Sequence, residues 1–222
     1  MLHGVSLDVP YGQMVAIMGP SGSGKSTLLY CLAGLEATTS GAVALAGSDV
    51  SRLSRRALAR MRRREVGFVL QSYNLVPTLT AAENVALPYT LAHKRPEAGL
   101  GESTLASVGL AEGAGARPPS MSGGEQQRVA LARVLAQRPS VVFADVPTGA
   151  LDTRTGEVVL GELARIAHAP ERCVLVVTHD PNVAAACDRV LFMRDGRLVS
   201  ERRGVDAAAV AATLADLGRA EG

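Results

Sequence analysis

The chain has 222 residues, of which 47% are hydrophobic and 20% are charged, and its formal net charge is +2. This composition is ordinary for a globular protein and excludes a disordered, collagen-like or disulfide-rich chain. The small net charge and the 3% of aromatic residues give no support to a nucleic-acid surface, so we expect no nucleic-acid partner.

The cysteines and the apolar runs indicate the cellular compartment in which the chain is expected to fold. Cys31, Cys173 and Cys187 are widely spaced and odd in number, which predicts neither a metal site nor a disulfide framework and suits reduced, buried thiols of a cytosolic protein. The start of the chain lacks a charged-then-apolar leader, and none of the apolar runs approaches ~18 residues. We therefore expect no secretion signal and no direct insertion into a membrane.

The first part of the chain alternates apolar runs with turns. A weak alternation over residues 5–9 precedes an apolar run over 15–18, which predicts a strand that leads into a Gly/Ser-rich loop. A helix is expected next, over 25–33, with a glycine after it as the C-cap. Turn residues then precede a further short strand over 42–45.

The middle of the chain is less regular. The Arg-rich stretch 52–64 suits a helix with a solvated face; contact with anionic lipid headgroups is the alternative for its arginines. Residues 67–70 predict a buried strand. A stretch rich in Gly, Ala and Pro over 92–120 contains one expected helix at 102–108, and apolar residues at helical spacing predict another helix over 125–136.

The last part contains continuous apolar strands, over 141–144 and 174–177, followed by a hairpin that joins 190–193 to 198–199 through a Gly turn. Such strands with helices between them indicate an α/β fold whose parallel sheet is covered on both faces. The irregular middle of the chain would then be a second lobe inserted into this fold.

The strongest local motif is G-x-x-x-x-G-K-[ST], which residues 19–26 match in full between the expected strand and helix. Glycines let backbone N–H groups turn toward phosphate oxygens, and the helix that follows directs the positive end of its dipole at the anion. Lys25 would supply a charge to the β- and γ-phosphates, and the Ser26 hydroxyl would bind Mg²⁺. The residues assigned to nucleotide binding are Gly19, Ser21, Gly22, Ser23, Gly24, Lys25, Ser26 and Thr27.

Two further segments suit phosphate chemistry. Asp145 ends the apolar run 141–144, where the corresponding acid of phosphate-loop proteins holds the Mg²⁺ shell. A Gly-rich helix start about one hundred residues after the phosphate loop forms a second anion site. It consists of Ser122, Gly123, Gly124, Glu125 and Gln126. Such an element makes sense if it covers the nucleotide bound by a second copy of the chain.

Over nearly its whole length the chain resembles the nucleotide-binding subunits of ABC transporters. Residues 122–126 match the family signature S-G-G-[EQ]-Q, and Gln71 stands where the family has its Q-loop glutamine. Residues 145–152 are similar to the Mg-site and D-loop segment, and His179 stands at the switch histidine. Residues 67–85 are especially similar to the subgroup that serves lipoprotein-release, macrolide-export and peptide-antibiotic-resistance transporters.

The resemblance implies an α/β fold with a phosphate-loop (RecA-like) core, an inserted α-helical lobe and a small β-rich N-terminal part. Residues 1–222 would form a single nucleotide-binding domain. Its core lobe would comprise about 1–71 and 139–222, and its helical lobe about 72–138.

The resemblance also implies ATP and Mg²⁺ as cofactors. The metal site would be built from Ser26, Gln71 and Asp145. Gln71 would sense the γ-phosphate, and His179 would contact that phosphate and the attacking water. Within the signature, Ser122 and Gly124 would touch the γ-phosphate bound by the opposing subunit, and Asp152 would bridge the two sites. The partners implied are a second copy or a related ATP-binding subunit and an integral membrane permease. The location implied is the cytoplasm, on the inner face of the plasma membrane.

Val146 departs from the family pattern. The family has Glu directly after the Mg-binding Asp, as the base that polarises water, whereas valine carries no lone pair. Loss of a positioned base costs ~10²–10⁴-fold in rate. We therefore expect a subunit that binds ATP and closes a dimer but hydrolyses slowly.

Three functions remain open from the sequence. The first is an energy-coupling transporter subunit, and the second is a non-transport ABC ATPase such as a ribosome-binding or DNA-repair factor. Those usually have tandem cassettes or long coiled-coil insertions, which this chain lacks. The third is a regulatory ATP-binding module of a membrane complex without transport, held on ATP by Val146.

Overall fold

The computed structural model describes residues 2–149 and 151–219. A six-stranded sheet with the order β4-β5-β6-β1-β7-β8 forms its centre. These strands are β1 (Met14–Met18), β4 (Val66–Val69), β5 (Val141–Asp145), β6 (Cys173–Val177), β7 (Arg189–Arg194) and β8 (Arg197–Arg203). Neighbours from β4 to β7 are parallel, and β8 is antiparallel to β7. The predicted parallel α/β fold is confirmed.

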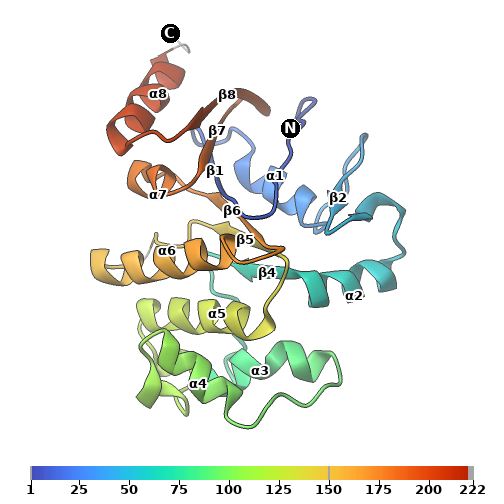
Figure 1. Cartoon of the computed structure of the whole chain (residues 1–222), viewed down its shortest axis with the longest axis vertical. Helices are drawn as coiled ribbons and strands as arrows, with labels where there is room; N and C mark the ends of the chain where they lie inside the picture. The colour runs from blue at the N-terminus through green and yellow to red at the C-terminus, as the bar shows by residue number, and fades with distance from the viewer. Residues whose placement is uncertain (1, 150, 220–222) are drawn as a thin grey trace.

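The strands are continuous apolar runs because both faces of the sheet are covered. In β1, Met14, Ala16 and Met18 pack into one buried cluster with α6, α7 and α8, whereas Val15 and Ile17 pack into another with α1. Figure 1 shows α6, α7 and α8 on one side of the sheet and α1 on the other. The helices are α1 (Lys25–Leu32), α2 (Arg55–Glu65), α3 (Ala81–Leu91), α4 (Leu100–Ser107), α5 (Gly123–Gln137), α6 (Thr153–Ala167), α7 (Pro181–Ala185) and α8 (Ala207–Arg219).

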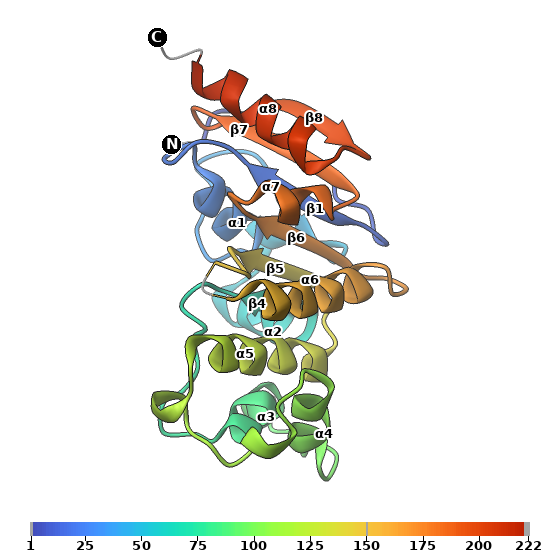
Figure 2. The ribbon, with the colours of Figure 1, turned by 90° about the vertical axis from the view of Figure 1, so that its left-hand side faces the viewer.

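Helices α3, α4 and α5 gather at the end of the molecule far from the C-terminus (Figure 1, Figure 2). Gly101 of α4 lies directly against Ala82 of α3, where a Cβ would approach Ala82 Cβ to 2.9 Å. On the sheet side, a Cβ at Gly67 of β4 would approach Val134 of α5 to 3.0 Å. All three helices fall within residues 72–138, and the boundaries of that lobe stay a prediction.

Several elements differ from the sequence expectations. Residues 5–9 form no strand, and the strand expected over 42–45 is limited to β2 (Ala44–Leu45), which pairs with β3 (Ser48–Asp49) as a short antiparallel ribbon. The sequence analysis also missed α3, α6 and α7. In α3 an internal proline obscured the pattern, although Thr80 and Glu83 form a capping box that marks its start.

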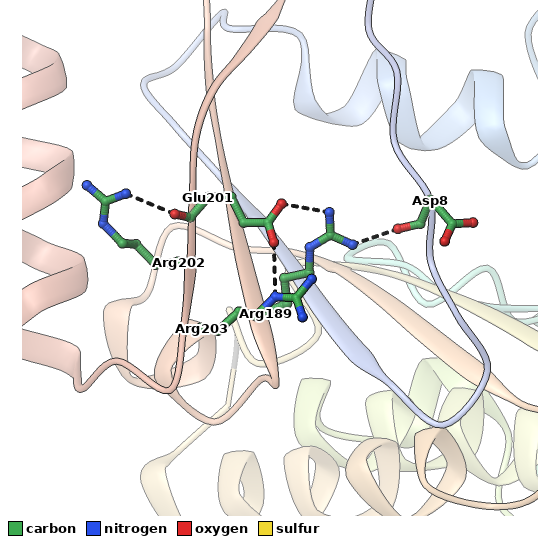
Figure 3. A network of polar contacts seen from close by, with 5 residues as sticks. All are labelled: Asp8, Arg189, Glu201, Arg202 and Arg203. Atoms are coloured by element: carbon green, nitrogen blue, oxygen red, sulfur yellow. Dashed lines mark hydrogen bonds and ion pairs between the residues drawn. The ribbon is translucent and has the colours of Figure 1, made fainter.

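A polar network anchors the N-terminal segment to the far edge of the sheet (Figure 3). The Arg189 guanidinium donates to the Asp8 carbonyl at 2.7 Å and to the Glu201 carboxylate at 2.7 Å. Arg203 donates to the other Glu201 oxygen at 3.1 Å. Because Arg189 is largely buried, this contact fixes the chain just before β1.

The described part of the chain contains no helix of sufficient length and apolar character to cross a membrane.

Candidate nucleotide-binding site

The phosphate loop, residues 19–26, connects β1 to α1 and is supported from behind by the β7–β8 hairpin. A Cβ on Gly19 would collide with the carbonyl oxygen of Met193, so only glycine fits there. Gly24 has φ 95° and forms the N-cap of α1. The Gly196 N–H in the hairpin turn donates to the Ser23 carbonyl at 3.1 Å. The loop is therefore held in place before any ligand contacts it.

Lys25 lies within this loop. Its ammonium donates to the carbonyls of Gly19 at 2.9 Å and Pro20 at 2.7 Å. Burial lowers the pKa of Lys25, and the nearby Asp145 carboxylate opposes that shift. The other assigned loop residues surround it: Ser23 is buried, Ser26 is half-buried, and Ser21, Gly22 and Thr27 are exposed. The geometry suits a lysine that exchanges backbone carbonyls for phosphate oxygens.

Asp145 ends β5 and is half-buried. Burial raises the pKa of its carboxyl, and the nearby Ser26 hydroxyl and Lys25 ammonium oppose that shift. A hydroxyl and a carboxylate near one another are oxygen donors that Mg²⁺ accepts, the remaining ligands coming from phosphates and water. Among the described residues, His, Cys, Asp and Glu form no cluster that could hold a metal alone. Ser26 and Asp145 therefore fit a magnesium ion that arrives with a nucleotide.

Gln71 and His179 follow β4 and β6, and both are exposed. Because β4, β5, β6 and β1 are parallel neighbours, their carboxyl ends meet at one edge of the sheet. The topology thus brings Gln71, Asp145, His179 and the phosphate loop to that edge. Buried Thr178 fixes the backbone beside His179, since its hydroxyl accepts the Asp180 N–H at 3.0 Å.

The signature segment, residues 122–126, begins α5 in the helical lobe. Ser122 is the N-cap, and Glu125 accepts hydrogen bonds from the Ser122 N–H at 2.7 Å and hydroxyl at 2.8 Å. These contacts lower the pKa of Glu125. The Gln126 amide donates to the Met121 carbonyl at 3.1 Å. The segment lies with helices α3, α4 and α5, away from the phosphate loop at the edge of the sheet.

Comparison with known proteins identifies the family. Residues 2–149 match the sequence profile of the ABC transporter family. The chain belongs to this family. A macrolide export ATP-binding/permease protein MacB of Bradyrhizobium diazoefficiens is 47% identical over 95% of this chain, which spans 32% of that protein. An ABC transporter ATP-binding protein of Thermotoga maritima is 48% identical over 92% of this chain and 88% of its own length.

Solved structures give the same answer. A dimeric, post-hydrolysis structure of the ATP-binding cassette MJ0796, bound to ADP and Pi, is 39% identical to this chain. It superposes with a TM-score of 0.85 over 92% of this chain and 90% of its own. The domain is therefore an ABC ATPase cassette by sequence and by fold, which confirms the resemblance drawn from the motifs.

Val146 of this ABC cassette lies directly after Asp145 and is half-buried. Its N–H donates to the Val177 carbonyl at 2.8 Å, and its φ of 46° is left-handed, which is unfavourable for a β-branched residue. Asp152 is exposed and forms the N-cap of α6, where its carboxylate accepts the Thr155 N–H at 3.0 Å. Ala150, between them in the D-loop motif, lies outside the described residues.

Sequence reasoning missed Arg133 of α5. Its guanidinium donates to the carbonyls of Asn74 at 2.8 Å and Tyr73 at 3.1 Å, in the turn that follows Gln71. Both turn residues have a left-handed φ, and a Cβ on Gly123 would approach the Tyr73 hydroxyl to 2.9 Å. Arg133 thereby ties the Gln71 loop of the cassette to the signature helix. The only sequence signal for this contact was that Arg133 is a charged residue close to the buried residues Val129, Leu131 and Ala132.

Proposed function

We propose that this ABC cassette is the ATP-binding, energy-coupling subunit of a transporter and closes as a head-to-tail dimer around two Mg-ATP. The placement of Lys25, Ser26 and Asp145 at one edge of the sheet carries this proposal, because it brings a phosphate-binding cation near two oxygen ligands suited to Mg²⁺. The dimeric form of the related cassette supports the assembly.

Each assigned residue then has one task. Lys25 and the N–H groups of residues 19–27 bind the phosphates, and the metal would be held by Ser26, Asp145 and Gln71. Bound Mg²⁺ would neutralise charge on the β- and γ-phosphates. His179 contacts the γ-phosphate and orients the attacking water. Ser122 and Gly124 in the signature of the opposing subunit bind the same phosphate, and Asp152 bridges the two sites.

Hydrolysis is impaired because Val146 occupies the position of the general base. Its side chain accepts no proton, and the Val146 N–H is already donated to the Val177 carbonyl. The phosphate-binding contacts do not involve residue 146. The subunit should therefore bind ATP and close without dissolving the dimer by turnover.

The partners proposed are a second copy or a related ATP-binding subunit and an integral membrane permease, which places the cassette on the cytoplasmic face of the plasma membrane. The relative from Bradyrhizobium diazoefficiens is named as both an ATP-binding and a permease protein, which supports this pairing. Val146 also favours a second candidate, a regulatory module that stays on ATP without transport. Measuring transport and turnover with the permease separates the two candidates.

Size-exclusion chromatography with and without Mg-ATP, together with a phosphate-release assay, tests the proposal. ATP binds the dimer better than the monomer if the signature of one subunit completes the site of the other, so ATP must shift the equilibrium toward dimer. We expect a dimer with negligible phosphate release. Turnover of about 1 s⁻¹ or faster would refute the role assigned to Val146.

A further inference from the structure

A pocket of about 380 Å³ lies between the C-terminal ends of α2 and α3. Its walls are fixed by hydrogen bonds that join three helices. Tyr89 donates to the Ala136 carbonyl at 3.0 Å, and the Gln137 amide donates to the carbonyls of Arg63 at 3.0 Å and Val66 at 2.8 Å. The pocket is therefore preformed and has the volume of a small-molecule site.

The charge of this pocket is unlike that of the whole chain. Four cationic side chains line it, those of Arg60, Arg63, Arg64 and Lys94, and no carboxylate does. Among the described residues, the side chains of Arg60 and Lys94 take part in no hydrogen bond or ion pair, whereas the Arg64 side chain pairs with Glu65 at 3.0 Å. The net charge of the chain is only +2, so this cluster is a local feature.

The macrodipole of α2 explains part of the cluster. Cations in the last turn of a helix are favourable, and Arg63 and Arg64 occupy that turn. Arg60 lies before the last turn, however, and Lys94 follows α3, so the dipole at the end of α2 accounts for neither of them. The helix dipole therefore does not explain why Arg60 and Lys94 line one cavity, whereas an anionic ligand in the cavity would explain it.

We propose that this pocket binds a phosphate group, either the headgroup of an anionic phospholipid or a free phosphate compound. Arginine forks bind phosphate oxygens bidentately, and Lys94 adds a point charge from a second element. A second phosphate site of this kind does not depend on ATP turnover.

The pocket is separate from the nucleotide site. Gln137 lies just before β5, and its amide contacts the first residue of β4, so the pocket is at the amino edge of the sheet. The phosphate loop follows the carboxyl end of β1, at the opposite edge. A ligand of one site can therefore be measured while the other is occupied.

The test compares two double variants of the full chain that remove the same charge from exposed positions. Arg60→Gln with Lys94→Gln empties the pocket of its two unpaired cations, and Arg55→Gln with Arg56→Gln removes two exposed arginines of α2 that do not line it. One arm measures co-sedimentation with vesicles of phosphatidylglycerol and phosphatidylcholine in equal parts, and with phosphatidylcholine alone. The other arm titrates inorganic pyrophosphate by calorimetry, with the nucleotide site saturated by a non-hydrolysable ATP analogue.

If a headgroup is the ligand, the Arg60/Lys94 variant loses at least about tenfold in binding to anionic vesicles, and the Arg55/Arg56 variant less than about twofold. If a free phosphate compound is the ligand, the heat of pyrophosphate binding disappears in the Arg60/Lys94 variant alone and the vesicle arm shows no difference. The proposal is overturned if the two variants behave alike in both arms, or if the unmodified chain binds neither probe.

Discussion

The segment after β1 and the segment after β5 lie at one edge of the sheet, separated only by β6. After β1, every group of the phosphate motif is present and the loop is supported by the β7–β8 hairpin. After β5, Asp145 is present, but Val146 follows it in a backbone conformation that valine disfavours. If the proposed roles hold, phosphate binding and water activation depend on separate segments, so a substitution in one should leave the other intact.

The largest expected effect comes from restoring a carboxylate after β5. Val146→Glu should raise ATP turnover by ~10²–10⁴-fold, because a positioned base contributes about that much. Phosphate release at saturating Mg-ATP measures it, and the lifetime of the ATP-bound dimer should shorten in parallel. Val146→Gln is the matched control, since it has the same shape without the charge and should stay slow. If the glutamate variant hydrolyses ATP no faster than the unmodified chain, the segment after β5 is not what limits turnover.

The next effect concerns the segment after β1. Lys25→Ala should weaken ATP binding about 10- to 100-fold, because hydrogen bonds to a charged group contribute about 1.5–3 kcal/mol. Calorimetry of Mg-ATP binding measures the change, and Arg55→Ala, on an exposed face of α2, serves as the control. Unchanged affinity for ATP in the Lys25 variant would contradict the role of the phosphate loop in ATP binding.

Outside these two segments, Arg133 ties the Gln71 loop to the signature helix α5. Arg133→Met should raise the ATP concentration that half-forms the dimer by about 3- to 10-fold, since the carbonyls of Tyr73 and Asn74 lose their donors. The Arg133→Lys variant keeps the charge and should recover part of the loss. Sizing at graded ATP gives the midpoints, with circular dichroism as a check of folding. Equal midpoints for all three proteins would show that the loop needs no such tie.

Burial of the Asp145 carboxylate destabilises the fold at neutral pH. Burial raises its pKa, so the folded chain holds this proton more tightly than the unfolded chain, and the free energy of unfolding falls as the pH rises through the interval between the two pKa values. Asp145→Asn should raise the free energy of unfolding at pH 7 by up to about 1 kcal/mol. That gain should vanish below the unfolded pKa, while Mg²⁺ ceases to strengthen ATP binding. Urea titrations over a pH series measure the first effect and calorimetry the second.

The smallest effect isolates the backbone at residue 146. Val146→Asn should stabilise the fold by up to about 1 kcal/mol, because asparagine tolerates a left-handed φ better than a β-branched residue. Val199, an exposed valine in β8, gives the control, since Val199→Asn should destabilise a strand instead. Urea unfolding decides, and a loss of stability in the Val146 variant would show that contacts of the valine side chain outweigh its backbone strain.

The sequence predicted those parts of the site that depend on local chemistry. The phosphate loop is a local backbone shape, and Asp145 follows from an apolar strand that ends in an acid. The contact between Arg133 and the Tyr73 turn joins segments about sixty residues apart, and no periodicity encodes such a pairing. The left-handed φ of Val146 was equally hidden, because valine is not a residue from which a reader expects that conformation.

The contact between the phosphate loop and the hairpin at Asp195 and Gly196 has a practical consequence. Exposed hairpin tips are ordinary places to insert an affinity tag or a fluorescent reporter, since they usually tolerate added residues. Here the Gly196 N–H supports the Ser23 carbonyl, and Met193 closes the space behind Gly19. A reporter inserted at this tip would therefore change the nucleotide affinity that it was meant to record.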